Sequence, residues 1–322
     1  MKFVLKFFKW LTIIFISLII LMYLFDVDYL LRAVRTIYFK GYTTAFLEDY
    51  KEFPNREIKK GIAQPWAIAS DYNSVPATET LQKTHKELQT IAYLIIKNDS
   101  IWHESYFDGF DKNSKTNSFS MAKSIVTMAM GKAIMEGKMK SLDQKVTDFF
   151  PELKGKYAKD VTIGDLSSMT SGLSWDEKYY SPFSIVTRAY FDNNLKEIIL
   201  GLKINEKPGQ SFKYLSGATQ LLAMCIEKAT GEHLSDYVSK HFWQPMGAEN
   251  EALWQLDEAP DGIEKAYCCI ASNARDFGRF GKLYLNNGKW NGQQLLDSAF
   301  VKKCITPRFE KSPEYGYGWW MH

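Results

Sequence analysis

The sequence predicts an α+β domain, in which an antiparallel sheet is flanked by helices and a helical subdomain fills the middle of the chain. Two observations predict this class. Strand-like runs stand toward both ends of the soluble part, at residues 89–107 and 315–320, and helical patterns occupy the sequence between them. The chain has 322 residues, enough for one large domain or two modest ones. Hydrophobic residues make up 46% and charged residues 24%, as in globular proteins.

The N-terminus predicts a membrane anchor. Lys2, Lys6 and Lys9 precede an apolar run over residues 10–25, which Asp26 closes. A span takes about 20 residues, and the apolar residues between the lysines can extend the run. Because no small-residue cleavage site follows, we favour an uncleaved signal anchor over a removed signal peptide, and a buried core helix is the weaker alternative. The basic flank predicts a single-pass protein of the cell membrane whose domain is extracytoplasmic, in the periplasm.

Three parts are therefore expected: a membrane anchor (residues 1–25), a juxtamembrane segment (26–76) and a catalytic domain (77–322). The juxtamembrane segment is aromatic and charged, and prolines interrupt it. In the domain, two β-rich runs around Asn98-Asp99-Ser100 predict a hairpin. The other expected elements are an apolar buried helix over 121–135, a capped short helix from Thr162, amphipathic helices over 218–229 and 275–285, and the start of a strand at 315–320.

Composition and spacing exclude several kinds of partner. The formal net charge is +3 and the lysines are scattered, so no nucleic acid is expected. The histidines show no ligand spacing, so no metal and no cofactor is expected. Outside the cytoplasm disulfides are permitted, but Cys268 and Cys269 are adjacent and are expected not to bond each other. Cys225 stands on a helical apolar face, as a small buried hydrophobe would.

Ser120 and Lys123 are the candidate catalytic pair. Positions i and i+3 of a helix share a face, and this S-x-x-K is unique in the chain and opens its most apolar soluble helix. Desolvation lowers the pKa of a lysine, and a neutral amine beside a serine can take its proton and make it a nucleophile. The alternative is a helix-capping serine with a lysine that reaches solvent.

Tyr214 is the candidate proton shuttle. It stands in K-Y-L-S-G (residues 213–217), between a Pro-Gly turn and a helix. A tyrosine placed there can share the proton of a serine–lysine pair and pass it to a leaving group. Without that pair it would be an ordinary half-buried tyrosine.

These motifs resemble the serine β-lactamase and penicillin-binding-protein superfamily, and in particular its class C-like branch of esterases, D-amino-acid peptidases and nylon-oligomer hydrolases. The resemblance runs from about residue 91 to the end, through SFSMAKS, TIGDLSSMTSGLSWDE, PGQSFKYLSGATQLLAMC, NARDFGRFGKLYLNNG and YGYGWW. It implies a β-lactamase/transpeptidase-like fold, with Ser120 as the acyl-forming nucleophile, Lys123 as its base and Tyr214 as the proton shuttle. By the same resemblance Ser216 and Tyr179 bind substrate: Ser216 takes a position often filled by asparagine, and Tyr179 resembles a tyrosine at the mouth of the nylon-oligomer hydrolase site.

Two departures accompany the resemblance. Where the family usually has glycines, this chain carries Cys268-Cys269, which is expected to alter the floor of the pocket. The family's third motif, a Lys- or His-x-Gly strand, should follow YGYGWW, and His322 comes too early to be assigned to it. We therefore expect the C-terminal strands and helix to be missing and the domain to be incomplete at its C-terminal end.

The sequence thus predicts a membrane-anchored serine hydrolase that acts on a small-molecule or peptide acyl substrate, an ester or amide. Two alternatives stay open. One is a D,D-peptidase or β-lactamase acting on cell-wall peptides or β-lactams, and the other is a penicillin-binding sensor or inactive scaffold that does not turn over.

Overall fold

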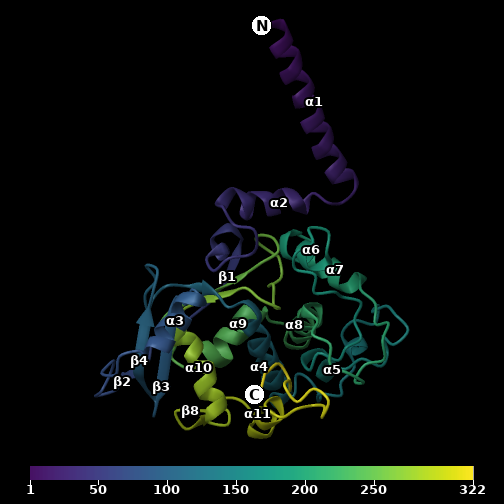
Figure 1. The fold of residues 1–322 in the computed structure, drawn as a ribbon. Helices are drawn as coiled ribbons and strands as arrows, with labels where there is room; N and C mark the ends of the chain where they lie inside the picture. The colour runs from purple at the N-terminus through teal and green to yellow at the C-terminus, as the bar shows by residue number, and fades with distance from the viewer. Residues whose placement is uncertain (322) are drawn as a thin grey trace.

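Small sheets and the helices around them form the body of the protein, and one long helix projects from it (Figure 1). The structure is a computed structural model that describes residues 1–321, and His322 lies outside the described residues. In chain order the helices are α1 (Lys2–Leu24), α2 (Tyr29–Thr36), α3 (Glu79–Glu87), α4 (Ala122–Met135), α5 (Ile163–Ser167), α6 (Ile185–Phe191), α7 (Leu195–Gly201), α8 (Ser216–Thr230), α9 (Leu234–Val238), α10 (Ala274–Leu285) and α11 (Ser298–Cys304). The strands are β1 (Asn55–Ile58), β2 (Ala67–Ile68), β3 (Ala92–Lys97), β4 (Ser100–Tyr106), β5 (Thr116–Asn117), β6 (Ala252–Gln255), β7 (Ile270–Ser272), β8 (Lys289–Trp290) and β9 (Gln293–Gln294).

The strands confirm the predicted α+β class. One sheet has the order β1-β6-β7-β5 with every neighbouring pair antiparallel. A second has the order β2-β4-β3, and its β3–β4 pair is the predicted hairpin. Asn98 and Asp99 form its turn with φ values of 50° and 61°. Asparagine and aspartate tolerate this left-handed conformation, which suits the twist of a two-residue hairpin.

The prediction that residues 315–320 begin a strand is wrong. Tyr315 and Trp320 form only an isolated bridge, and the chain between them is a tight loop against α4 and α5. Gly318 causes the turn: its φ is 72°, its N–H donates to the carbonyl of Ser167, and a Cβ on it would collide with the side chain of Thr127. The expected sheet from both chain ends is therefore not formed by the described residues.

Helix α4 is the centre of the core, as its apolar sequence predicted. Most of its side chains are buried, including Ile125, Val126 and Met130. It packs against α8, which also packs against α5 (Figure 1). The short helix α5 begins with the predicted capping box, in which Thr162 and Asp165 exchange hydrogen bonds with each other's backbone N–H groups. The site therefore rests on a rigid helical centre.

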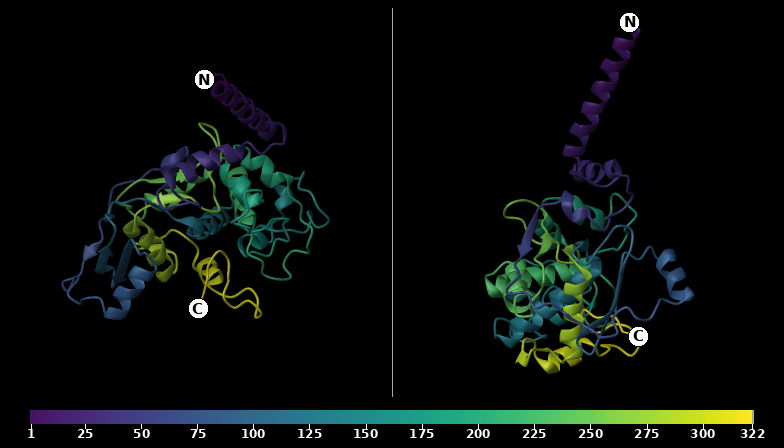
Figure 2. Two further views of the ribbon diagram at one scale, coloured as in Figure 1. Left: turned by 45° about the horizontal axis from the view of Figure 1, so that its top comes forward. Right: turned by 90° about the vertical axis from the view of Figure 1, so that its left-hand side faces the viewer.

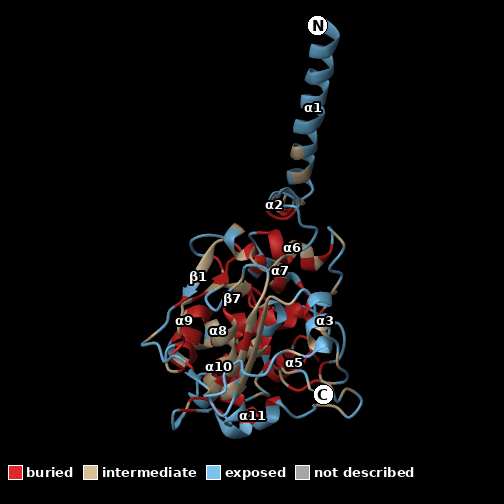
Figure 3. Ribbon diagram, turned by 60° about the vertical axis from the view of Figure 1, so that its left-hand side comes forward, coloured by how far each residue is buried: buried red, intermediate tan, exposed pale blue. Residues whose placement is uncertain are grey.

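Residues 26–76 are part of the body of the protein. Helix α2 packs against α6, strand β1 pairs with β6, and Tyr29, Phe53 and Trp66 are buried in the common core. The preceding helix, α1, is different: it projects from the body of the protein (Figure 2), and none of its residues is buried (Figure 3). It is long and apolar enough to cross a membrane, with a mean hydropathy of 2.2.

Candidate active site

Ser120 and Lys123 meet where the 3₁₀ turn η3 (Phe119–Met121) runs into α4. The Lys123 Nζ and Ser120 Oγ atoms are 2.9 Å apart and hydrogen-bonded. Nζ also donates to the carbonyl oxygen of Tyr267, at 2.7 Å. Lys123 is only 3% exposed, whereas Ser120 is open to solvent. The pair therefore combines an accessible hydroxyl with a sequestered amine.

The backbone before Ser120 is held in an uncommon conformation. Phe119 has a φ of 44°, in the left-handed region that an L-residue enters at a cost of about 1–2 kcal/mol. The side chain of Asn117 accepts a hydrogen bond from the Phe119 N–H at 2.8 Å, and the Ser118 N–H donates to the Ile270 carbonyl at 2.7 Å. These contacts hold the turn against β7. They fix Ser120 at the N-terminal end of α4, where free N–H groups and the helix dipole favour negative charge.

Burial changes the acid–base behaviour of Lys123. Loss of hydration lowers the pKa of its ammonium to about 7, and the negative charge of Glu177 partly opposes this shift. An ordinary lysine titrates near 10.4. At neutral pH about half of the Lys123 side chains therefore carry an amine that can accept a proton.

Tyr214 lies beside this pair. Its ring centre is 5.0 Å from the Lys123 Nζ, and burial raises the pKa of its hydroxyl, although the adjacent Ser120 hydroxyl opposes the rise. It stays protonated at neutral pH, so it can relay a proton but not act as a resting base. The rings of Tyr315 and Trp320 pack against it, at centroid distances of 6.2 and 5.6 Å. The loop that the sequence suggested to be a strand thus supports Tyr214.

Glu177 is a site residue that the sequence did not reveal. It accepts hydrogen bonds from the Ser216 N–H, from the Ser216 hydroxyl at 3.2 Å and from the indole of Trp175 at 3.0 Å. It therefore fixes the buried Ser216 at the start of α8 and places a negative charge near Lys123. Its place two residues before Tyr179, in WDEKY, was the available signal.

Tyr179 and Ser216 both line a cavity of about 550 Å³, together with Ser120 and Lys123. Tyr179 is 53% exposed, and partial burial and the neighbouring Glu177 raise the pKa of its hydroxyl. This volume is in the range of small-molecule sites. Four of the five predicted site residues thus line one cavity, and the fifth, Tyr214, contacts the Ser120–Lys123 pair.

The floor of the cavity contains a disulfide that was not expected. Cys268 and Cys269 are bonded to each other, so the prediction that these neighbours stay apart is wrong. The bond is accompanied by a left-handed backbone at Cys269, whose φ is 79°. Cys268 lines the cavity directly after Tyr267, whose carbonyl binds Lys123. Cys225 is buried and free, as predicted for a small hydrophobe.

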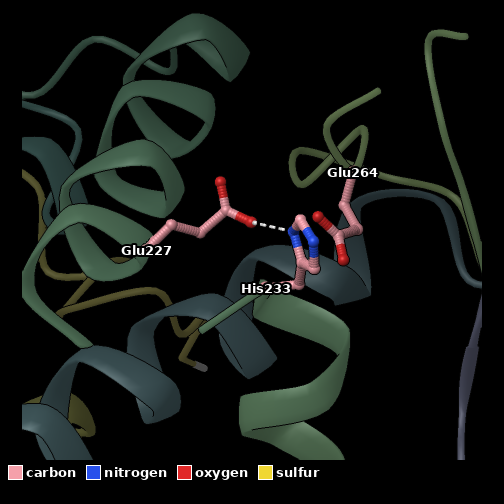
Figure 4. Close-up of side chains that lie close together, drawn as sticks. All are labelled: Glu227, His233 and Glu264. Carbon is pink, nitrogen blue, oxygen red and sulfur yellow. Dashed lines mark ion pairs between the residues drawn. The ribbon is translucent and has the colours of Figure 1, made fainter. Parts of the chain in front are cut away.

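Away from this cavity, Glu227, His233 and Glu264 place potential ligand atoms within 4.8 Å of one another (Figure 4). Each of the three side chains has an internal partner, although one oxygen of Glu264 is buried without a hydrogen bond. Glu264 pairs with Arg56 at 2.8 Å, and His233 lies 3.7 Å from Glu227. Burial and the adjacent Glu264 raise the pKa of Glu227 to about 8, which favours a neutral acid over a metal ligand. We read the cluster as a structural network.

Comparison with known proteins gives a family profile, Beta-lactamase, that matches residues 77–322. The chain is 25% identical over 237 residues to the 6-aminohexanoate-dimer hydrolase of Paenarthrobacter ureafaciens, a match that covers 70% of this chain and 59% of that protein. It is 27% identical over 188 residues to protein flp of Staphylococcus aureus (strain MW2), covering 55% and 37% respectively. The chain therefore spans less than two thirds of the length of these curated relatives.

Solved structures show the same fold. A putative 6-aminohexanoate-dimer hydrolase from Bacillus anthracis superposes with a TM-score of 0.68 at 22% identity, over 90% of this chain and 79% of that one. FmtA from Staphylococcus aureus superposes with a TM-score of 0.55 at 16% identity, over 82% and 78%. A D-stereospecific amidohydrolase from Streptomyces sp. gives 0.54 at 17% identity, over 70% and 75%.

Proposed function

Because this chain belongs to the beta-lactamase family, we propose that it is a membrane-anchored serine hydrolase that cleaves an ester or amide through an acyl-enzyme on Ser120. The observation that carries the proposal is the 2.9 Å contact between an exposed Ser120 hydroxyl and a buried Lys123 amine. Two relatives named as hydrolases of an aminohexanoate dimer and one named as an amidohydrolase support amides as well as esters.

In the proposed reaction, neutral Lys123 takes the proton of Ser120 as Oγ attacks the substrate carbonyl carbon. The tetrahedral oxyanion forms at the positive end of α4. When it collapses, the carbon–heteroatom bond breaks, and the leaving group takes the proton through Tyr214. Water then attacks the acyl-enzyme, gives its proton to Lys123 and releases the acid, which restores the Ser120 hydroxyl.

The anchor belongs to the same proposal. Three lysines lie in the first half of α1, and the following helix α2 packs on the domain. At 1.5 Å per residue, the 23 residues of α1 extend about 34 Å, enough for a hydrocarbon core of about 30 Å. The lysines favour a cytoplasmic N-terminus and a domain on the other, periplasmic side of the membrane.

The test is p-nitrophenyl acetate hydrolysis by the purified full chain. Ser120→Ala should abolish turnover with an unchanged circular dichroism spectrum, and Ser141→Ala, at an exposed turn, should act as the unmodified chain does. Intact mass should show an acetyl adduct on the unmodified chain only transiently. Turnover by Ser120→Ala would end the proposal. An adduct that persists for hours would instead favour the penicillin-binding sensor.

A further inference from the structure

One wall of the cavity that contains Ser120 is the membrane-proximal helix α2. Its lining side chains are Leu30, Ala33, Val34, Ile37 and Tyr38. These positions follow i, i+3, i+4, i+7 and i+8, so they form a single stripe along α2 and the turn after it. Arg35 is exposed and is not among the lining residues. The helix thus turns its apolar face into the site.

A second wall comes from α6 and the loop before it, and it is also mainly apolar. Val186, Tyr190 and Phe191 contribute side chains there. The two walls are fastened to each other beside the anchor: the Tyr29 hydroxyl donates to the Pro182 carbonyl at 3.0 Å, and Arg188 forms an ion pair with Asp26. These contacts join the two walls where α1 meets the domain.

Exposed aromatic rings, which we call the aromatic rim, stand on the two segments that line the cavity; Tyr38, Tyr179 and Tyr180 line it, and the others are their neighbours in sequence. The members of the rim are Tyr38, Phe39 and Tyr42 on the α2 side, and Tyr179, Tyr180 and Phe183 on the side of the loop before α6. Phe39 is 80% exposed and Tyr180 is 91% exposed. Aromatic side chains are enriched where proteins meet the headgroup region of a membrane.

The distance from the anchor is short. Only residues 25–28 separate the end of α1 from the start of α2, so Leu24 and Tyr29 are at most about 18 Å apart. In Figure 1, α2 lies next to the lower end of α1 and above α6, and both views of Figure 2 show α2 beside the end of α1. If α1 spans the bilayer, the aromatic rim lies next to the bilayer surface.

On the basis of the serine hydrolase function proposed above, we propose that this cavity takes the acyl chain of an amphiphilic ester or amide held in the membrane. The acyl chain of the substrate lies between α2 and α6, and its carbonyl carbon reaches Ser120. Attack by Oγ breaks the bond between the acyl carbon and the headgroup heteroatom, and the headgroup leaves with a proton. Water then releases the acyl chain as a free acid, so atoms and charge balance.

The first experiment is a chain-length series. The full chain in phosphatidylcholine vesicles is given p-nitrophenyl acetate, hexanoate and octanoate. Complete burial of one methylene supports a factor of about four, so kcat/KM should rise at least tenfold from acetate to octanoate. A flat series with active acetate hydrolysis would overturn the acyl-chain cavity and leave the proposed function intact. Absence of Ser120-dependent acetate hydrolysis would instead refute the proposed function.

A pair of variants tests whether the acyl chain of the substrate lies along α2. Val34→Trp adds bulk on the lining stripe of α2, and should lower the ratio of the octanoate rate to the acetate rate at least fivefold. Arg35→Trp places the same side chain at the neighbouring exposed position, which does not line the cavity, and should leave that ratio unchanged. If Val34→Trp leaves the ratio of the octanoate rate to the acetate rate unchanged, the acyl chain does not lie along α2 and the proposal fails.

A third measurement tests the membrane as the source. A fluorogenic laurate ester is placed either in the vesicles that carry the protein or in separate vesicles, at equal total concentration. Hydrolysis in the shared membrane should be at least fivefold faster. Equal rates would show that the substrate arrives through water, and would overturn membrane capture.

Discussion

The pH dependence of hydrolysis follows directly from the burial of Lys123. With a pKa of about 7, half of the lysines are neutral at pH 7 and about one in a hundred at pH 5. An exposed lysine would be neutral in fewer than about one molecule per thousand at pH 7. Since the proposed base is the neutral amine, kcat/KM should rise tenfold per pH unit below about pH 7 and then level off.

The assay is kcat/KM for p-nitrophenyl acetate from pH 5 to 9, with the spontaneous rate subtracted, because this ratio reports groups of the free enzyme. Glu177→Gln supplies the perturbation. The carboxylate of Glu177 raises the pKa of Lys123, so its removal should move the midpoint to lower pH. Lys123→Arg should be inactive at every pH, because arginine keeps its proton. A rate that is constant between pH 5 and 7, or a midpoint that rises in Glu177→Gln, would refute Lys123 as the base.

Three further outcomes are expected. The pKa of Lys123 is lower in the folded than in the unfolded chain, so folding releases protons and the free energy of unfolding should rise by at most roughly 5 kcal/mol between about pH 7 and 10.5. Urea titrations should show that Lys123→Met lacks this rise, and an equal slope in both would contradict it. Alkylation of the unfolded chain should modify two thiols before reduction and all four after it, whereas four before reduction would exclude the Cys268–Cys269 bond. Gly318→Ala should lower the melting temperature more than Gly292→Ala, because both have a positive φ but only at 318 does a Cβ meet a neighbouring side chain; equal shifts would remove that reason.

The predictions that agree with the structure come from local sequence patterns. The spacing of Ser120 and Lys123, the Asn98-Asp99 turn and the capping box at Thr162 each involve residues close in sequence, so elementary helix and turn geometry suffices to find them. What the sequence did not reveal depends on distant contacts. Glu177 meets Ser216 across the fold, and α2 becomes a wall of the cavity only because it packs on α6. The sequence pattern around Glu177 does not indicate that it contacts Ser216, and the pattern of α2 does not indicate that it packs on α6.

A second buried lysine shows why burial alone does not identify a base. Lys265 is fully buried, and loss of hydration holds its pKa well below that of an ordinary lysine, as at Lys123. Its Nζ, however, donates to the carbonyl of Tyr190 at 2.6 Å and lies 3.6 Å from the centre of the Phe53 ring. Those contacts hold the wall of the cavity and offer no hydroxyl to activate. Lys123 has the exposed Ser120 hydroxyl 2.9 Å away, and on that juxtaposition we propose Lys123, and not Lys265, as the base.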